Sequence, residues 1–236
     1  MMKTKDIRTW ILRVALLLLG LTIAHLGVTL FLQADLGSDP FNVLIQGLVN
    51  SFGSAVIAGY SAAIKLNTFA ITGFITLGNG ISTFTAQNLG ARKPERVGQG
   101  LRAGLVMGFA IAVPFFLAYF FADSAMIGLF LEEGTAAAFE TGCMFLRIVA
   151  PFYFVILIKL VTDGVLRGAG AMNAFMVSTF TDLILRVLLA FVVAGRFGTT
   201  GVWCTWPIGW TAATVMTAGY YFTGRWKRAW AVHHEE

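Results

Sequence analysis

LGNGISTFTAQNLGARKPERVGQGLRAG, residues Leu77–Gly104, joins the end of one apolar segment to the start of the next through a short basic loop. Pro94 stands in the loop, and the cations in and just after it are Arg92, Lys93, Arg96 and Arg102. Short connections rich in Lys and Arg stay on the cytoplasmic side of a membrane, so the sequence predicts a cytoplasmic loop. The segment before it mixes polar residues and glycines with apolar ones, which is typical of a helix that packs against other helices or lines a wet cavity.

The composition is that of an integral membrane protein. Hydrophobic residues make up 57% of the 236 residues and charged residues 12%, and the mean hydropathy is +0.77. The net charge of +5 comes from Lys and Arg residues placed singly or in small groups between apolar runs, so we expect no nucleic-acid partner. Cys143 and Cys204 lie inside apolar segments with no Cys or His grouping, and we expect packing roles rather than a disulfide or a metal site.

Seven apolar stretches reach the roughly 20 residues that a helix needs to span the bilayer. They are Trp10–Gln33, Phe41–Ile64, Leu66–Leu89, Leu101–Ala122, Phe139–Leu166, Ala174–Gly195 and Val202–Phe222. The chain lacks the alternating ten-residue pattern of a barrel, and open sheet edges cannot face lipid. The predicted fold class is therefore all-α, a polytopic bundle of transmembrane helices.

Prolines and one connection modify these helices. Asp39 followed by Pro40 predicts the start of the second helix, because Asp caps a helix and Pro suits its first turn. Pro114, Pro151 and Pro207 lie inside later segments, where each removes a backbone hydrogen bond and can kink the helix. The connection 123–138 contains MIGLFLEEG, which we interpret as a short interfacial helix ending at Gly134, with a plain loop as the alternative.

From Gly47 to Trp226 the chain resembles the C-terminal half of a MATE (multidrug and toxic compound extrusion) transporter of the DinF/NorM kind. The resemblance is carried by GLVNSFGSAVIAGYSAAIKLNTFAI, by the stretch Leu77–Gly104, by LRIVAPFYF with VLRGAGAMNAF, and by FGTTGVWCTWPIGW. The most specific feature is the QNLGA-basic loop followed, at this separation, by the LRGAG turn. The resemblance implies six helices forming one of the two halves of such a transporter.

The first 48 residues are different: ALLLLGLTIAHLGVTLFLQADLGSDPFNVLIQGL is similar to the opening hairpin of YczE/YitT-type membrane proteins. We therefore divide the chain into residues 1–48, a MATE-like bundle at 49–228 and a polar tail at 229–236. In the MATE-like topology an extra helix in front puts the amino terminus outside. The cations there, Lys3, Lys5, Arg8 and Arg13, favour the inside. We hypothesise a fusion or a mis-joined gene whose first helix is inverted or does not span.

Charged residues inside membrane segments are candidates for function. Lys159, Asp163 and Arg167 follow one another at four-residue spacing and so share a helix face. Asp163 is our candidate for binding a coupling cation or proton, with its affinity set by Lys159; the alternative is that Lys159 and Arg167 only neutralise a buried carboxylate. Asp182 and Arg186 form a second such pair, for which we favour mutual neutralisation and leave a part in the transport cavity open.

Candidates for a substrate cavity are polar and aromatic. Asn50, Tyr60, Gln87 and Asn88 could bind substrate by hydrogen bonds, or they could connect helices. Phe152 and Tyr153 belong to a set of aromatic residues that could hold an organic cation against their rings. With 21 Phe in the chain, most of these rings must pack or face lipid.

The resemblance implies part of a secondary antiporter that exports organic, often cationic, compounds in exchange for Na⁺ or H⁺, in the cell's inner (plasma) membrane. One half cannot alternate alone, so the expected partners besides lipid and small organic substrates are a second copy or a separate amino-terminal half. We expect no enzyme activity and no cofactor beyond the coupling ion. His25 is alone within the first helix, His233 and His234 lie in the polar tail, and GAGAMN follows a membrane helix rather than a strand. The alternatives are a YczE/YitT-like protein of unassigned role and an inactive truncated or fused fragment.

Overall fold

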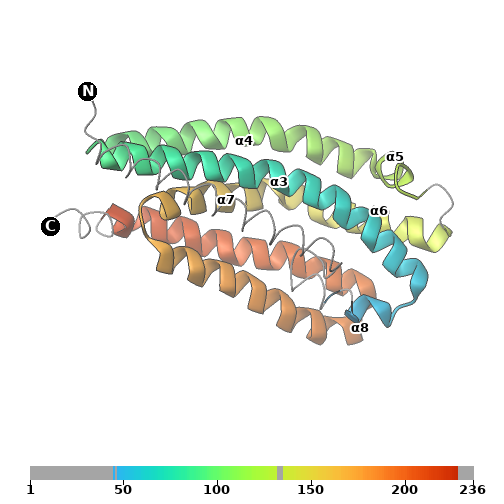
Figure 1. Cartoon of the computed structure of the whole chain (residues 1–236). Helices are drawn as coiled ribbons and strands as arrows, with labels where there is room; N and C mark the ends of the chain where they lie inside the picture. The colour runs from blue at the N-terminus through green and yellow to red at the C-terminus, as the bar shows by residue number, and fades with distance from the viewer. Residues whose placement is uncertain (1–44, 46, 132–134, 228–236) are drawn as a thin grey trace, which may run out of the picture. The chain divides into compact units, whose positions relative to one another are not determined.

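The computed structural model describes residues 45, 47–131 and 135–227, and these form helices joined by short turns (Figure 1). The helices are α3 (Ser54–Gly90), α4 (Glu95–Phe121), α5 (Asp123–Gly128), α6 (Ala136–Val149), the 3₁₀ turn η1 (Ala150–Phe152), α7 (Tyr153–Gly168) and α8 (Met172–Phe222). The predicted all-α transmembrane fold is confirmed: four helical stretches in this part of the chain are long and apolar enough to cross a membrane. The first predicted span, Trp10–Gln33, and the predicted helix start at Pro40 lie outside the described residues.

The chain divides into two compact units, Met1–Gly47 and Leu48–Glu236, and helices α3 to α8 all belong to the second. Its first long helix, α3, contradicts the predicted boundary between spans at Lys65, because the helix runs through that residue without a break. The turn lies earlier, at Gly53, whose φ of 104° suits glycine. Lys65 is exposed on α3. Neighbouring alanines and leucine favour helix, and a long lysine side chain can leave the apolar layer without ending the helix.

The predicted span Phe139–Leu166 is two helices joined by η1 at Pro151. Pro151 ends α6 because proline cannot donate the next helical hydrogen bond, whereas Pro114 and Pro207 are accommodated within α4 and α8. The 51-residue α8 is two helices that meet at Gly198, where φ is 57° and ψ is −146°. This break lies between the two predicted spans Ala174–Gly195 and Val202–Phe222.

The connection after α4 contains the predicted short helix, but its predicted end at Gly134 is wrong, because α5 ends at Gly128. A turn follows, in which Phe130 N–H and Leu131 N–H both donate to the Ile127 carbonyl. Asp123, in the first turn of α5, is buried and ion-paired to Arg147 of α6, with 2.5 Å between Oδ2 and Nε. This pair fixes α5 against α6 at the end of the unit opposite the basic loop.

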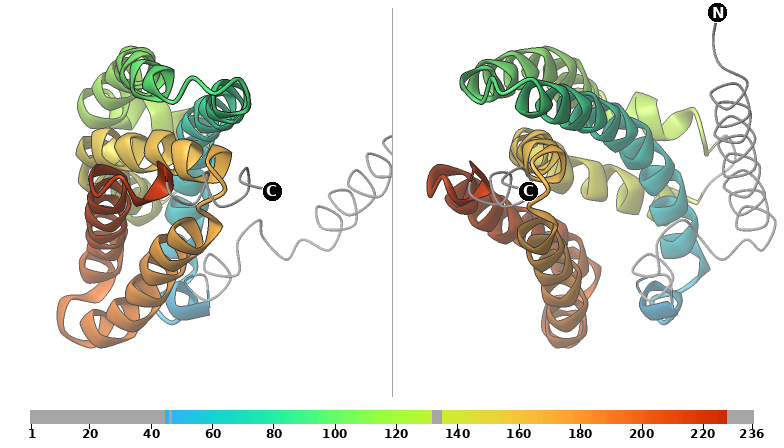
Figure 2. Two further views of the ribbon diagram at one scale, coloured as in Figure 1. Left: turned by 90° about the vertical axis from the view of Figure 1, so that its left-hand side faces the viewer. Right: turned by 60° about the vertical axis from the view of Figure 1, so that its left-hand side comes forward.

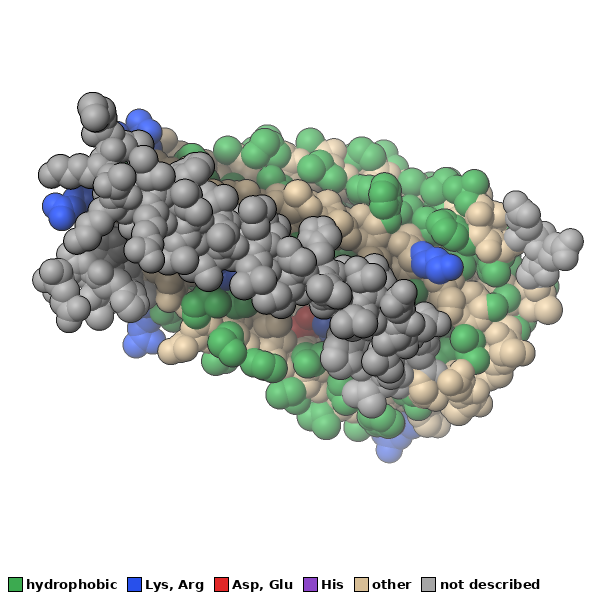
Figure 3. Space-filling model, viewed as in Figure 1, with side chains coloured by type: hydrophobic (Ala, Val, Ile, Leu, Met, Phe, Trp, Pro, Cys, Tyr) green, Lys and Arg blue, Asp and Glu red, His purple; other side chains and the backbone are tan. Residues whose placement is uncertain are grey.

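Helix α7 lies between the α3–α4 pair and the two halves of α8 in both views (Figures 1 and 2) and packs against all of them. The loop 91–94, the turn 169–171 and the end of α8 lie at one end of the unit (Figure 1). Several Lys and Arg side chains gather at that end, at the left of Figure 3, while the side chains along the drawn face are mostly hydrophobic or uncharged. A charged end and apolar flanks are what a bilayer requires.

We expect impermeant maleimide to label the two ends of this unit from opposite sides of the membrane. In a chain whose Cys143 and Cys204 are replaced by alanine, Phe130→Cys should react on intact cells, whereas Pro94→Cys and Thr223→Cys should react only after lysis. Labelling of Pro94→Cys from outside would contradict a cytoplasmic basic loop.

Candidate functional site

Lys159 and Asp163 form an ion pair inside the helical bundle. The sequence places them one turn apart on α7, and Lys159 Nζ donates to Asp163 Oδ2 at 2.5 Å. Both side chains are buried, with exposed fractions of 5% for Lys159 and 1% for Asp163. The predicted pairing on one helix face is therefore confirmed, and the ammonium neutralises a carboxylate that water hardly reaches.

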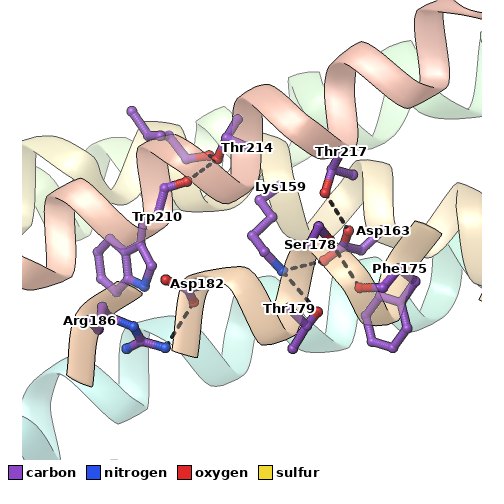
Figure 4. A network of polar contacts seen from close by, with 11 residues as sticks. Lys159, Asp163, Phe175, Ser178, Thr179, Asp182, Arg186, Trp210, Thr214 and Thr217 are labelled. Atoms are coloured by element: carbon purple, nitrogen blue, oxygen red, sulfur yellow. Dashed lines mark hydrogen bonds and ion pairs between the residues drawn. The ribbon is translucent and has the colours of Figure 1, made fainter. Parts of the chain in front are cut away.

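Both halves of α8 contact this pair (Figure 4). Thr217, in the second half, donates its hydroxyl to Asp163 Oδ1 at 3.0 Å. Lys159 Nζ also lies 3.5 Å from the Thr179 hydroxyl in the first half. The pair thus connects three helical segments, so a change in its charge acts on the packing of α7 against both parts of α8.

A second buried pair lies further along the first half of α8. Arg186 Nη2 donates to Asp182 Oδ2 at 2.8 Å, and the guanidinium carbon lies 5.0 Å from the centre of the Trp206 ring. Gly209 leaves room for the pair, because a side chain there would meet the Asp182 carboxylate. Thr179, Asp182 and Arg186 follow one another at three- and four-residue spacing on α8, so the second pair lies on the same face of α8 as the threonine that contacts Lys159 (Figure 4).

The energetics of the Lys159–Asp163 pair make it sensitive to a second cation. Breaking a buried pair by removing one partner costs about 3–5 kcal/mol, because the remaining charge is left without compensation. A proton on Asp163 would strand the ammonium, and another cation at the carboxylate would be repelled by Lys159 unless the lysine moved away. The carboxylate therefore compensates one positive charge, and in this structure that charge is the ammonium of Lys159.

Arg167 departs from the predicted shared role. Within the described residues it forms no ion pair with Asp163, and its guanidinium carbon lies 5.3 Å from the centre of the Phe175 ring. Lys159, rather than Arg167, neutralises the carboxylate on this face. Arg167 instead closes the turn between α7 and α8 against an aromatic ring.

The six substrate-cavity candidates do not meet in one place. Tyr60 is buried and stacked on Trp203, and Tyr153 is buried with its hydroxyl donating to Asn67 Oδ1 at 3.2 Å. Gln87 and Asn88 lie 27 and 28 residues beyond Tyr60 on the same helix, which is about 40 Å at 1.5 Å per residue. Asn50 precedes α3 and is exposed, and Phe152 is half-buried in η1. Tyr60 and Tyr153 therefore belong to the packed interior.

Sequence reasoning missed Thr217 and Thr179 at this site and, at the other end of the unit, the Asp123–Arg147 pair. The two threonines carry no sequence signal, because they reach the ion pair only through tertiary packing. Arg147 does carry one, since a cation inside an apolar segment needs a counter-charge. No group of three or more His, Cys, Asp or Glu side chains in the described ranges could hold a metal ion.

Comparison with known proteins adds to this geometry. The profile of the family MatE matches residues 41–192. The chain is 27% identical over 184 residues to "Probable multidrug resistance protein YpnP" of Bacillus subtilis, covering 78% of this chain and 41% of that protein. It is 21% identical over 182 residues to "Probable multidrug resistance protein YoeA" of the same organism, covering 76% and 39%. The chain thus spans about two fifths of the length of these curated relatives.

Solved structures share the fold. A crystal structure of MATE in the bent conformation matches with a TM-score of 0.71 at 21% identity, covering 78% of this chain and 41% of that one. A MATE family transporter of the MOP superfamily matches in its outward-facing conformation with a TM-score of 0.70 at 22% identity, covering 78% and 41%. An inward-facing MATE structure matches with a TM-score of 0.68 at 21% identity, covering 76% and 41%. At this level of sequence identity, the TM-scores show that the chains share a fold.

Proposed function

This chain belongs to the MatE family of membrane transporters, and on that premise we propose that it forms one lobe of a secondary multidrug antiporter. The antiporter would export organic, often cationic, compounds in exchange for Na⁺ or H⁺. We further propose that it works in the cell's inner (plasma) membrane, where ion gradients drive such exchange. The observation that carries the proposal is the buried Lys159–Asp163 pair, which contacts both halves of α8.

Asp163 is the carboxylate at which we propose that the exchange occurs. An antiporter must not carry its ion and its substrate together, and one buried carboxylate cannot compensate two cations. Lys159 would neutralise Asp163 while neither ligand is present, which keeps an uncompensated charge out of the apolar interior. Na⁺ or H⁺ and the organic cation would then compete for the same site in turn.

Alternation between the two sides of the membrane requires a second lobe. We propose that a second copy of this chain or a separate amino-terminal half supplies it, with the two bundles rocking about a central cavity. The similar fit of this lobe to inward-facing and outward-facing relatives supports a lobe that keeps its internal fold during such a motion.

We expect Asp163→Asn to abolish ion-driven uptake in proteoliposomes. The chain, with or without a co-expressed amino-terminal half, is reconstituted and challenged with a fluorescent organic cation under an H⁺ or a Na⁺ gradient. Asn keeps the shape of Asp163 but has no charge to exchange, so uptake should fall to the level of empty vesicles. Which gradient drives uptake identifies the coupling ion.

The matched control is Asp123→Asn, which also removes a buried, ion-paired carboxylate but lies at the other end of the unit. Its uptake should remain close to that of the unaltered chain. Unchanged uptake in Asp163→Asn would eliminate Asp163 as the coupling residue. No uptake by the unaltered chain under either gradient, alone or with its co-expressed half, would favour the inactive-fragment alternative.

A further inference from the structure

A groove with a volume of about 700 Å³ lies between α3 and α4, in the half of the unit that ends in the basic loop. Its walls include Gly73, Gly80 and Phe84 of α3 and Ala103, Met107 and Ile111 of α4. Glycine and alanine on its walls leave this space free: a Cβ added at Gly80 would meet no atom within 4 Å. Both walls are helices long and apolar enough to cross a membrane, and the groove side chains Phe84, Met107 and Ile111 are exposed.

The polar residues of α3 do not make this groove hydrophilic. The Thr76 hydroxyl, which lines it, donates to the Thr72 carbonyl at 2.9 Å, and the Thr72 hydroxyl donates to the Thr68 carbonyl at 2.8 Å. These donors are satisfied within their own helix and present methyl groups outward. An apolar chain can therefore enter without leaving a hydrogen bond unmade.

One end of the groove is cationic. Ile111, Met107, Ala103 and Gln99 follow one another at four-residue spacing along α4, and Arg96, which precedes Gln99 by three residues and is exposed, continues the same face. Ile111 lies 12 residues after Gln99 on α4, a rise of about 18 Å, which is close to the thickness of one leaflet of the hydrocarbon core. Arg92 and Lys93 add charge in the adjoining loop.

We propose that this groove binds an acyl chain of an anionic phospholipid in the basic-end leaflet, with the headgroup phosphate held by Arg96. Shape and charge agree with this occupant: the groove is one leaflet long, apolar along its length and cationic where a headgroup would lie. A transmembrane helix of another protein, the other occupant that such a groove could take, carries no phosphate for the Arg96 guanidinium to bind at the leaflet boundary. The site is separate from the Lys159–Asp163 pair and holds whether or not that pair couples transport.

The test is native mass spectrometry of the purified full chain, released from detergent with equal amounts of dioleoyl phosphatidylglycerol and dioleoyl phosphatidylethanolamine. The acyl chains are identical, so the ratio of the two adducts measures headgroup selection. The unaltered chain should retain phosphatidylglycerol preferentially. Arg96→Gln should lower that preference about fivefold, as expected for one cation near a phosphate. Arg225→Gln, which removes an exposed cation near the end of α8, should leave it unchanged.

Gly80→Leu fills the groove and should reduce retention of both lipids about tenfold, because the acyl chain loses its apolar contacts. Ala103→Phe, on the opposite wall, should have the same effect and replaces Gly80→Leu if that variant does not fold. A second groove, lined by Lys65 and Phe130 among others, supplies a further control. If Lys65→Gln lost the preference for phosphatidylglycerol and Arg96→Gln kept it, the lipid would bind at the second groove and the proposal would be overturned. Equal retention of the two lipids by the unaltered chain would also overturn it, as would a groove-filling variant that changes oligomeric state but not lipid retention.

Discussion

Asp163→Leu should lower the free energy of unfolding by about 3–5 kcal/mol, measured from denaturant titration of the purified chain in detergent. The substitution leaves the Lys159 ammonium, whose side chain is 5% exposed, in an apolar interior without its counter-charge. It also removes the acceptor of the Thr217 hydroxyl. Such a loss is a large part of the stability of most domains.

Two further variants separate the charge effect from simple loss of packing. Lys159→Met combined with Asp163→Leu should regain most of the lost stability, because a buried pair replaced by apolar side chains of similar volume is often neutral or stabilising. Asp123→Leu is the matched control: its carboxylate is as buried, but its partner Arg147 is 60% exposed and stays solvated. We expect a smaller loss for Asp123→Leu than for Asp163→Leu, because the guanidinium left behind is in water rather than in an apolar interior. Equal losses in Asp163→Leu and Asp123→Leu would contradict a buried charge on Lys159.

The spacing of charges predicted these pairs because helix geometry is local. Four-residue spacing puts Lys159 near Asp163 and Asp182 near Arg186 in any α-helix, and both ion pairs form. Thr217 lies 54 residues from Asp163 in the chain, and its hydrogen bond depends on how α8 returns past α7. No local pattern encodes that return, so the pair was predictable and its connection to both halves of α8 was not.

The extent of helices was predictable where glycine or proline interrupts them. The break at Gly198 and the junction at Pro151 follow from backbone chemistry. Lys65 misled the prediction, because a charge within an apolar run was interpreted as a loop while the backbone there had no reason to leave the helix. For Tyr60 and Tyr153 the sequence left a cavity role and a packing role open, because their burial depends on rings from other helices. Composition cannot distinguish a ring that packs from one that faces a cavity.

Gly78→Ala should destabilise the fold, whereas Gly80→Ala, two residues further along α3, should not. A Cβ at Gly78 would lie 2.6 Å from the Leu160 carbonyl oxygen of α7, while at Gly80 it would meet nothing within 4 Å. Backbone atoms cannot rotate away as a side chain can, so Gly78→Ala must push α3 and α7 apart. We expect a loss of about 1–3 kcal/mol for Gly78→Ala and a gain of up to about 1 kcal/mol for Gly80→Ala.

The two helices meet at these residues because both sides are small: a Cβ at Gly164 of α7 would in turn collide with the Gly78 carbonyl. The combined Gly78→Ala and Gly164→Ala variant should therefore lose little more stability than the worse single variant, since the first substitution has already separated the helices. Full additivity in denaturant titration would contradict a shared contact. Leu160 follows Lys159 in the chain, so displacing α7 there also shifts the buried pair. Gly78→Ala should therefore lower both the ion-driven uptake and the free energy of unfolding, whereas Gly80→Ala should lower neither.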